Sequence, residues 1–221
     1  GIAVTINNND ITPSTVDFSD FGDARTDGQT VIRTFLIENN GSADLNINLP
    51  ISISGAAAAD FSVNVQPAAT VAPGGNTSFQ VTFDPSATGN RDATIGFSSD
   101  DIDDPNFSFA ITGNGTIPEI IVESNSNIIQ NGSFIPSVNN NTDFGNSIAA
   151  FQTIEHIFYL KNIGNSTLSL VGTQIEISGV HQNEFSLNTT STNPTIAAGD
   201  STSFSIVFMP QSPGEKNASI L

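Results

Sequence analysis

The chain has 221 residues, with 22 acidic and 5 basic side chains, a formal net charge of −17 and no cysteine. Because this charge repels phosphate backbones and anionic membranes, we expect no nucleic-acid binding and no direct membrane insertion. The absence of cysteine excludes disulfides, iron–sulfur clusters and cysteine nucleophiles. No apolar run approaches the roughly 20 residues that a transmembrane helix needs.

The rest of the composition is typical of an exported β-protein. Asn, Ser, Thr and Gly are abundant, whereas Lys and Glu are scarce. The chain opens on Gly1 rather than Met, so we expect a mature or excised part of a longer protein whose targeting segment lies outside it. We therefore predict an extracellular or bacterial cell-surface location.

Alternation of apolar and polar residues is the main pattern along the chain. The stretch "FLIENNGSADLNI" (residues 35–47) is interpreted as a hairpin, with Gly41 supplying a positive φ at an Asn-Gly turn. Further on, "FQVTF" places Phe79, Val81 and Phe83 on one face, and "FSFAI" (residues 107–111) alternates in the same way. This pattern predicts strands with one face packed in a core and the other in water.

The same elements recur in the second half of the chain. The stretch "FYLKNIGNSTLSL" (residues 158–170) repeats the first hairpin, and "FSIVF" (residues 204–208) repeats the strongest strand. A longer match joins "TVAPGGNTSFQVTFDPSATG" (residues 70–89) to "TIAAGDSTSFSIVFMPQSPG" (residues 195–214). The order is kept and the spacing between copies changes only in loops, so we predict a tandem duplication of a domain of about 110 residues.

The repeat predicts an all-β chain of two tandem immunoglobulin-like β-sandwich domains. The first domain is predicted to cover residues 1–115, a short linker residues 116–118, and the second domain residues 119–221. The boundary falls at "TGNGTIP" (residues 112–118). Its Gly-Asn-Gly centre is expected to break the strand, and Pro118 is expected to fix φ before the next strand begins.

The second copy differs from the first at its end. In the first copy "ATIGFSSD" (residues 93–100) is followed by "DIDDPNFSFAITGNG" (residues 101–115), whereas "ASIL" (residues 218–221) matches only the beginning of this region. The second domain is therefore predicted to lack its last strand. Two interpretations stay open: the sequence is cut within a longer protein, or the empty sheet edge takes a strand from another chain.

The stretches "FLIENNGSADLNI", "FQVTFDPSATG" and "FSSDDIDDPNFSFAITGNG" resemble the choice-of-anchor D domain of bacterial surface proteins. That domain is similar to the ASH (ASPM, SPD-2, Hydin) and major-sperm-protein-like immunoglobulin-type sandwiches. The first copy matches the family pattern along its whole length, and the second copy matches up to Leu221, with Ile163 in place of the turn asparagine. The resemblance implies an exported, often multidomain, surface-attached protein, and it implies no catalytic residues.

The candidates for catalysis are weak. The two histidines, His156 and His181, have no histidine at the matching positions of the first copy, and we interpret them as surface or edge residues. The sequence contains no G-x-S-x-G elbow, no P-loop and no H-E-x-x-H motif. We therefore predict that the protein is not an enzyme, with no catalytic residues and no bound cofactor other than calcium.

The candidate calcium site is "SDDIDDP" (residues 99–105), because Ca²⁺ binds carboxylate oxygens supplied by a tight loop. Its four carboxylates belong to Asp100, Asp101, Asp103 and Asp104. The spacing does not match the EF-hand pattern, and Asp-rich segments before a proline are common in ordinary hairpin turns, which is the alternative interpretation. Both interpretations stay open.

Together these features predict a non-catalytic structural or spacer module of an exported cell-surface or filament-forming protein, such as a stalk, adhesin or fibre. Its partners would be neighbouring domains of the same protein, other copies of it, or a surface protein or glycan. The alternative is a protein- or glycan-binding module that acts through its end loops, with or without calcium. The absence of Trp argues against strong stacking on sugars, and Tyr159 is the one aromatic residue expected on an outer face.

Overall fold

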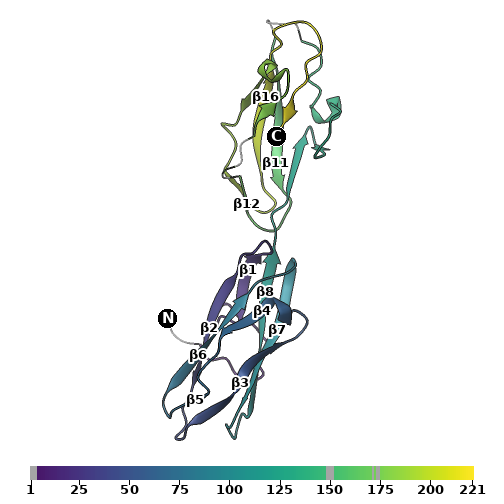
Figure 1. Cartoon of the computed structure of the whole chain (residues 1–221). Helices are drawn as coiled ribbons and strands as arrows, with labels where there is room; N and C mark the ends of the chain where they lie inside the picture. Colours follow the sequence, from purple (N-terminus) through teal and green to yellow (C-terminus); the bar gives the residue numbers. More distant parts are fainter. Residues whose placement is uncertain (1–3, 148–151, 171, 173–174) are drawn as a thin grey trace. The chain divides into compact units, whose positions relative to one another are not determined.

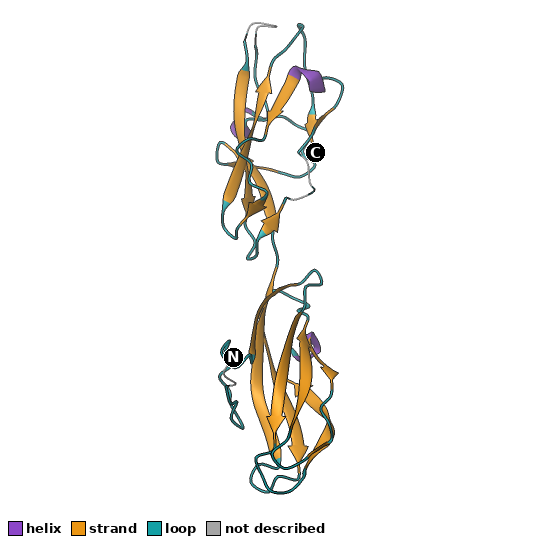
Figure 2. Ribbon diagram, turned by 90° about the vertical axis from the view of Figure 1, so that its left-hand side faces the viewer, coloured by secondary structure: helices purple, strands orange, loops and turns teal. Residues whose placement is uncertain are grey.

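The computed structural model describes residues 4–147, 152–170, 172 and 175–221, and it forms an all-β chain (Figure 1). Clustering of the backbone divides the chain into two compact units, Gly1–Ile117 (unit 1) and Pro118–Leu221 (unit 2). Figure 2 shows strands in orange throughout both units. The helical elements of the described residues are the 3₁₀ turns Ala58–Asp60, Val138–Asn140 and Gln182–Glu184. None of the described residues belongs to a helix that is long and apolar enough to cross a bilayer.

Unit 1 is a sandwich of two sheets (Figure 1). The first sheet contains, in spatial order, β1 (Asp20–Arg25), β8 (Asn106–Thr116), β7 (Gly89–Ser99), β3 (Leu45–Ser54) and β5 (Thr70–Val71). The second sheet contains β2 (Val31–Glu38), β6 (Asn76–Phe83) and β4 (Phe61–Val65). Strands β1 and β8 are parallel, and the other pairs of named strands in this unit are antiparallel.

The core of unit 1 follows the predicted alternation. Phe79, Val81 and Phe83 of β6 are at most 1% exposed, which confirms that they share the packed face of the strand. Across the sandwich, Ile95 of β7 and Ile111 of β8 belong to the same buried cluster and are fully buried. Full burial of a side chain of this size contributes roughly 1.5–3 kcal/mol, so these alternating residues position the two sheets face to face.

The predicted hairpin at residues 35–47 is wrong. Strand β2 pairs with β6, whereas β3 pairs with β5 and β7, so the two strands lie in different sheets. Gly41 is not among the described residues with a positive φ. A Cβ at this position would lie 3.1 Å from Oδ1 of Asn39, so the glycine accommodates a side chain that organises the crossing between sheets.

The strand break predicted at the Gly-Asn-Gly segment is also wrong, because β8 continues through it to Thr116. A Cβ on Gly113 would lie 2.5 Å from the ring of Phe83, and a Cβ on Gly115 would lie 2.0 Å from the carbonyl oxygen of Ala87. Real side chains essentially never come so close. The two glycines are therefore needed for close packing against the strand rather than for chain reversal.

Unit 2 contains a five-stranded sheet with short strands packed beside it. The sheet has the order β10 (Asn127–Ile129), β9 (Ile120–Ser124), β11 (Ile154–Asn162), β16 (Ser201–Phe208) and β14 (Phe185–Asn188). The short pairs are β12 (Leu168–Ser169) with β15 (Thr195–Ile196), and β13 (Ile177–Ser178) with β17 (Ser219–Ile220). Here too β11 and β12 belong to different sheets, so the repeat of the first stretch is again a crossing between sheets.

The edge of β11 carries the β9–β10 hairpin. Its turn residues Asn125 and Ser126 have φ values of 48° and 59°, as a two-residue turn of type I′ requires. In unit 1 the corresponding strand, β2, stands at the edge of its sheet. The segment that precedes the first strand of unit 1 instead lies beside β8, where Asp10 bridges to Phe109.

The two units also differ beside β7 and beside its counterpart in unit 2, β17. Strand β13 pairs with β17 as β3 pairs with β7, with Ile177 opposite Ile220 and Ile53 opposite Ile95. Among the described residues of unit 2, no strand takes the position that β8 occupies beside β7. The described part of unit 2 therefore lacks a counterpart of the last strand of unit 1, as the sequence predicts.

Candidate functional site

The four aspartates of the predicted calcium site lie in the loop between β7 and β8. Asp100 is exposed and accepts hydrogen bonds from the backbone and side-chain amides of Asn46, at 2.8 and 2.7 Å. The backbone hydrogen bond from Asn46, followed by the side-chain one, lowers the pKa of the Asp100 carboxyl below its usual value. This carboxylate therefore ties the start of the loop to β3.

The carboxylates of Asp101 and Asp104 make separate contacts. Oδ1 of Asp101 accepts the backbone N–H groups of Asp103 and Asp104, at 2.9 and 3.2 Å, and Oδ1 of Asp104 accepts the side-chain amide of Asn8 at 2.7 Å. Within the described part of the chain, no three His, Cys, Asp or Glu side chains are grouped to hold a metal. The calcium site stays a prediction, which titration of the protein with Ca²⁺ would test.

The two histidines have structural partners. The ring of His156 stacks on Phe144 with centroids 4.5 Å apart, and its Nδ1 lies 2.7 Å from the carbonyl oxygen of Asn141. Nδ1 of His181 accepts the backbone N–H of Asn217 at 3.1 Å. Both rings thus connect neighbouring segments of unit 2.

A buried asparagine organises the crossing between sheets in unit 1. Asn39 follows β2 and is 6% exposed. Its amide donates to the carbonyl oxygens of Ala43 and Val71, both at 2.8 Å, and its Oδ1 accepts the N–H of Gly41 at 2.9 Å. One side chain therefore satisfies three backbone groups that the loop leaves without partners in a ladder.

Asn162 does the same in unit 2, where it is fully buried. Its amide donates to the carbonyl oxygens of Ser166 and Ile196, and its Oδ1 accepts the N–H of Gly164 at 3.0 Å. The repeat thus preserves the three hydrogen bonds of Asn39, and in unit 2 Oδ1 of Asn162 also accepts the backbone N–H of Glu119 at 3.2 Å. The matching positions of Asn39 and Asn162 in the two copies were the available sequence signal, which the Asn-Gly pattern of a turn does not include.

An acidic residue at the end of a 3₁₀ turn forms a second repeated arrangement. Asp60 in unit 1 is 2% exposed, forms an ion pair with Nε of Arg91 and accepts the backbone N–H of Ser86 at 3.2 Å. Burial by itself would raise the pKa of Asp60, but the hydrogen bonds from Ser86 and Arg91 outweigh it and hold the pKa below its usual value. Asp60 therefore stays ionised in the folded unit at neutral pH.

Unit 2 repeats this arrangement with longer side chains. Glu184 ends the matching 3₁₀ turn, its Oε1 lies 3.5 Å from Nζ of Lys216, and its Oε2 accepts the backbone N–H of Gln211. Both members of the pair have mostly buried side chains. The change from Asp and Arg to Glu and Lys keeps the charge on each side and changes the geometry, because Lys offers a point charge rather than a planar fork.

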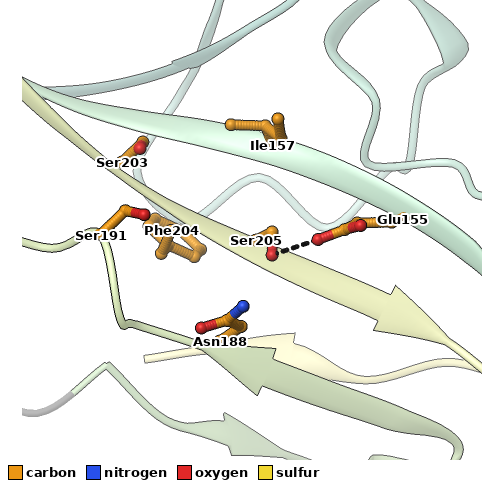
Figure 3. Close-up of a pocket in the computed structure, with 7 residues that line it drawn as sticks. All are labelled: Glu155, Ile157, Asn188, Ser191, Ser203, Phe204 and Ser205. Carbon is orange, nitrogen blue, oxygen red and sulfur yellow. Dashed lines mark hydrogen bonds between the residues drawn. The ribbon is translucent and has the colours of Figure 1, made fainter.

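A cavity of about 160 Å³ lies on the outer face of the five-stranded sheet of unit 2. Figure 3 shows its wall, formed by side chains of β11, β16 and β14 and of the loop that follows β14. The lining residues are Glu155, Ile157, Asn188, Ser191, Ser203, Phe204 and Ser205. No short sequence motif marks this site, because its residues come from three strands and a loop.

The comparison between copies contained a signal for this cavity. Relative to the first copy, the second gains a residue between Leu187 and Thr195, in the loop that includes Ser191. In addition, Glu155 and Ser205 stand where the first copy has Ile32 and Gln80. An added loop residue and a smaller strand side chain both favour an opening at this surface.

Comparison with known proteins finds that unit 1 is similar to immunoglobulin-like domains. Residues 10–114 match the family described as "HYDIN/CFA65/VesB-like, Ig-like domain". The match lies within unit 1, and its limits include all eight strands of the unit up to the last two residues of β8. No curated protein sequence gave a significant match to the chain.

Several solved structures match the chain at low sequence identity and low TM-score. The secreted serine protease VesC from Vibrio cholerae is 12% identical over 91% of this chain and 49% of its own, with a TM-score of 0.37, so this chain spans about half the length of VesC. A protein of unknown function from Porphyromonas gingivalis W83 is 11% identical over 87% of this chain and 80% of its own, with a TM-score of 0.30. The Vibrio cholerae VesB protease is 17% identical over 49% of this chain and 31% of its own, with a TM-score of 0.30.

Proposed function

We propose that this chain is a non-catalytic structural module, a spacer within an exported cell-surface or filament-forming protein. The observation that carries the proposal is the kind of residue that the two units share. The shared residues are the core phenylalanines, the buried asparagine and the buried acid–base pair, all of which hold the sandwich together. The duplication therefore repeats the residues that stabilise the fold, as expected of a structural module.

The outer faces of the two units support the same proposal, because they differ where the cores agree. On the outer face of β2 and β11, the exposed Leu36 of unit 1 corresponds to Tyr159 of unit 2, and Ile32 corresponds to Glu155. A spacer needs a stable sandwich and a soluble surface, and it places few other demands on outward-facing side chains. The net charge of −17 supplies that solubility.

The export part of the proposal has separate support. The composition is rich in Asn, Ser, Thr and Gly, and the sequence resembles the choice-of-anchor D and ASH domains of surface-attached proteins. The match of residues 10–114 to an Ig-like family that includes Hydin agrees with that resemblance. The proposal includes the more specific assignment of the chain to the choice-of-anchor D family, which is supported by the sequence resemblance.

A replacement experiment in the parent protein tests the spacer function. Residues 1–221 are deleted in one strain and replaced in another by two unrelated immunoglobulin-like domains of similar length. A spacer predicts that deletion reduces the surface display or assembly of the parent protein, and that the unrelated domains restore it. If only the native residues restore it, the alternative function, binding through the end loops, is supported instead.

A further inference from the structure

The cavity on the outer face of unit 2 has the chemistry of a binding site. Oε1 of Glu155 accepts the hydroxyl of Ser205 at 2.6 Å, as the dashed line in Figure 3 shows. Its second carboxylate oxygen, Nδ2 of Asn188 and the hydroxyls of Ser191 and Ser203 have no hydrogen-bond partner among the described residues. The small cavity therefore presents a carboxylate oxygen that can accept a hydrogen bond and an amide N–H that can donate one. Its two serine hydroxyls can each donate or accept.

The loop that forms one wall of the cavity is fixed in place. Oδ1 of Asn188 accepts the N–H and the hydroxyl of Thr190, at 3.0 and 2.8 Å, which sets the direction of the chain after β14. The hydroxyl of Thr192 donates to the carbonyl of Ser203 at 2.9 Å, and the hydroxyl of Thr202 donates to the carbonyl of Ser191 at 3.1 Å. Because these hydrogen bonds already hold the loop in place, little conformational entropy of the loop is lost when a ligand binds.

The charge of the cavity limits the class of ligand. Glu155 is the charged residue of its lining, and the whole chain carries a net charge of −17, so phosphates and carboxylates are repelled. A purely apolar ligand would bury the carboxylate and the asparagine amide without hydrogen bonds, which is costly. A neutral ligand with several hydroxyl groups can donate to the carboxylate and accept from the amide, while its C–H groups contact Ile157.

Size and surroundings agree with a single sugar residue. The volume of about 160 Å³ is below the roughly 300–1,000 Å³ typical of pockets for drug-sized ligands. Directly beside the cavity, Tyr159 pairs in register with Ser203, so both side chains lie on the same face of the sheet. Tyr159 is 42% exposed, and its ring offers a second contact surface to a neighbouring sugar residue of a longer glycan.

We propose that the outer-face cavity of unit 2, lined by Glu155, Asn188, Ser191, Ser203 and Ser205, binds one residue of a neutral saccharide. This binding site lies on a sheet face rather than in the end loops, and it is independent of the spacer function. Its polar lining and small size predict weak binding, with a dissociation constant in the millimolar range.

Nuclear magnetic resonance tests the proposal on the complete 221-residue chain. Amide spectra are recorded during titration with glucose, galactose, mannose, N-acetylglucosamine and their disaccharides. At least one neutral sugar should shift the amides of Ser203, Ser205 and Tyr159 in a saturable manner. Tyr159 is the one tyrosine of the chain, which contains no Trp, so its fluorescence gives an independent reading.

Substitutions toward unit 1 provide the specificity test. Ser205→Gln and Glu155→Ile introduce the side chains that unit 1 carries at the matching positions, and each should weaken binding at least tenfold. The reverse change in unit 1, Gln80→Ser, is the matched control and should leave the binding of the sugar unchanged. Because Gln80 and Ile32 occupy these positions in a folded sandwich, the substituted units are expected to fold, and their amide spectra verify this.

Three outcomes would overturn the proposal. The first is that no sugar shifts these amides at saturating concentration. The second is that the shifts persist in both substituted proteins, which would place binding elsewhere. The third is that Ca²⁺ or methylammonium, used as cation controls, occupies the cavity while the neutral sugars do not. A response to disaccharides that exceeds the response to monosaccharides would identify a glycan chain as the ligand.

Discussion

In unit 1 the rings of Phe61 and Phe83 stack with centroids 4.8 Å apart, and in unit 2 the rings of Phe185 and Phe208 stack at 4.9 Å. A second stacked pair is repeated as closely, at 5.3 Å in unit 1 and 5.4 Å in unit 2. These pairs join strands of the same sheet in each unit. The two copies therefore share the aromatic framework of one sheet almost without change.

The units differ in what covers this framework. In unit 1, Phe35 also packs against Phe109 of β8 at 5.3 Å, and Phe61 is only 5% exposed. In the described part of unit 2, β8 has no counterpart, and Phe185 is only partly buried. One sheet therefore carries the repeated pattern, whereas the facing sheet determines how completely the core is closed. Substitutions of the shared phenylalanines should therefore lower the free energy of unfolding more in unit 1 than in unit 2.

The largest expected effect comes from removing a shared ring. Phe83→Ala should destabilise unit 1 by about 3–5 kcal/mol, because the ring is fully buried and its loss leaves a cavity. Phe208→Ala removes the matching ring, which is 7% exposed, and should cost less in unit 2. Denaturant unfolding followed by residue-resolved amide signals measures each unit separately. Equal losses of unfolding free energy in the two units would contradict the inference that the core of unit 2 is less completely closed.

The next effect comes from the buried acid–base pairs. Asp60→Asn should destabilise unit 1 by about 3 kcal/mol at neutral pH, because it leaves the Arg91 charge without its partner. Glu184→Gln should cost less, because its partner Lys216 lies 3.5 Å away and also donates to Ser212. The measurement is again denaturant unfolding of each unit, and a larger loss for Glu184→Gln would contradict the comparison.

The same pair predicts a pH dependence. Because the pKa of Asp60 is lower in the folded unit than in the unfolded chain, its contribution is complete above the unfolded pKa of about 4 and is lost as the pH falls through the folded pKa. Unit 1 should therefore lose stability in acid, and Asp60→Asn should reduce that loss. Unfolding measured from neutral to acidic pH tests this, and an unchanged pH profile in the variant would contradict it.

A moderate effect is expected from the buried asparagines. Asn39→Ala removes three hydrogen bonds to the backbone in unit 1 and should cost about 2 kcal/mol, because the carbonyl oxygen of the buried Val71 loses this partner. Asn162→Ala should cost a similar or slightly larger amount in unit 2, because Asn162 makes the same three hydrogen bonds and also accepts the backbone N–H of Glu119. Thermal unfolding of both variants measures the two losses of stability. A large difference between them would show that the crossing is not equivalent in the two copies.

The smallest effect is expected on the outer faces. Leu36→Ala in unit 1 and Tyr159→Ala in unit 2 change exposed, matching positions, and each should alter stability by no more than about 0.5 kcal/mol. Thermal unfolding of the two variants checks this. A loss above about 1 kcal/mol from either substitution would indicate that the outer face is covered in the folded protein.

The sequence predicted the features that depend on periodicity. Alternation identified Phe79, Val81 and Phe83 as core residues, since a strand turns every second side chain to the same face. The internal repeat predicted two sandwiches and the shortened second copy. These predictions depend on the regular geometry of a single strand or on the order of strands, and both can be read from one chain.

The sequence did not predict features that depend on which strands become neighbours. A strand, a turn and a strand have the same local pattern in a hairpin and in a crossing between sheets, so the partners of Asn39 were not visible. Gly115 has the sequence appearance of a strand break, yet it is needed because the carbonyl of Ala87 approaches it. The cavity of unit 2 likewise forms from residues that only the folded sheet brings together.

Native-state hydrogen exchange at two matched amides tests whether the facing sheet determines the stability of each unit. Val81 and Ile206 occupy the same position in the middle strand of the shared three-strand framework, each between the same two neighbours. If the facing sheet determines stability, the amide of Val81 exchanges more slowly than that of Ile206 in the 221-residue chain. Exchange at Ile206 that is as slow as at Val81, or slower, would contradict this account.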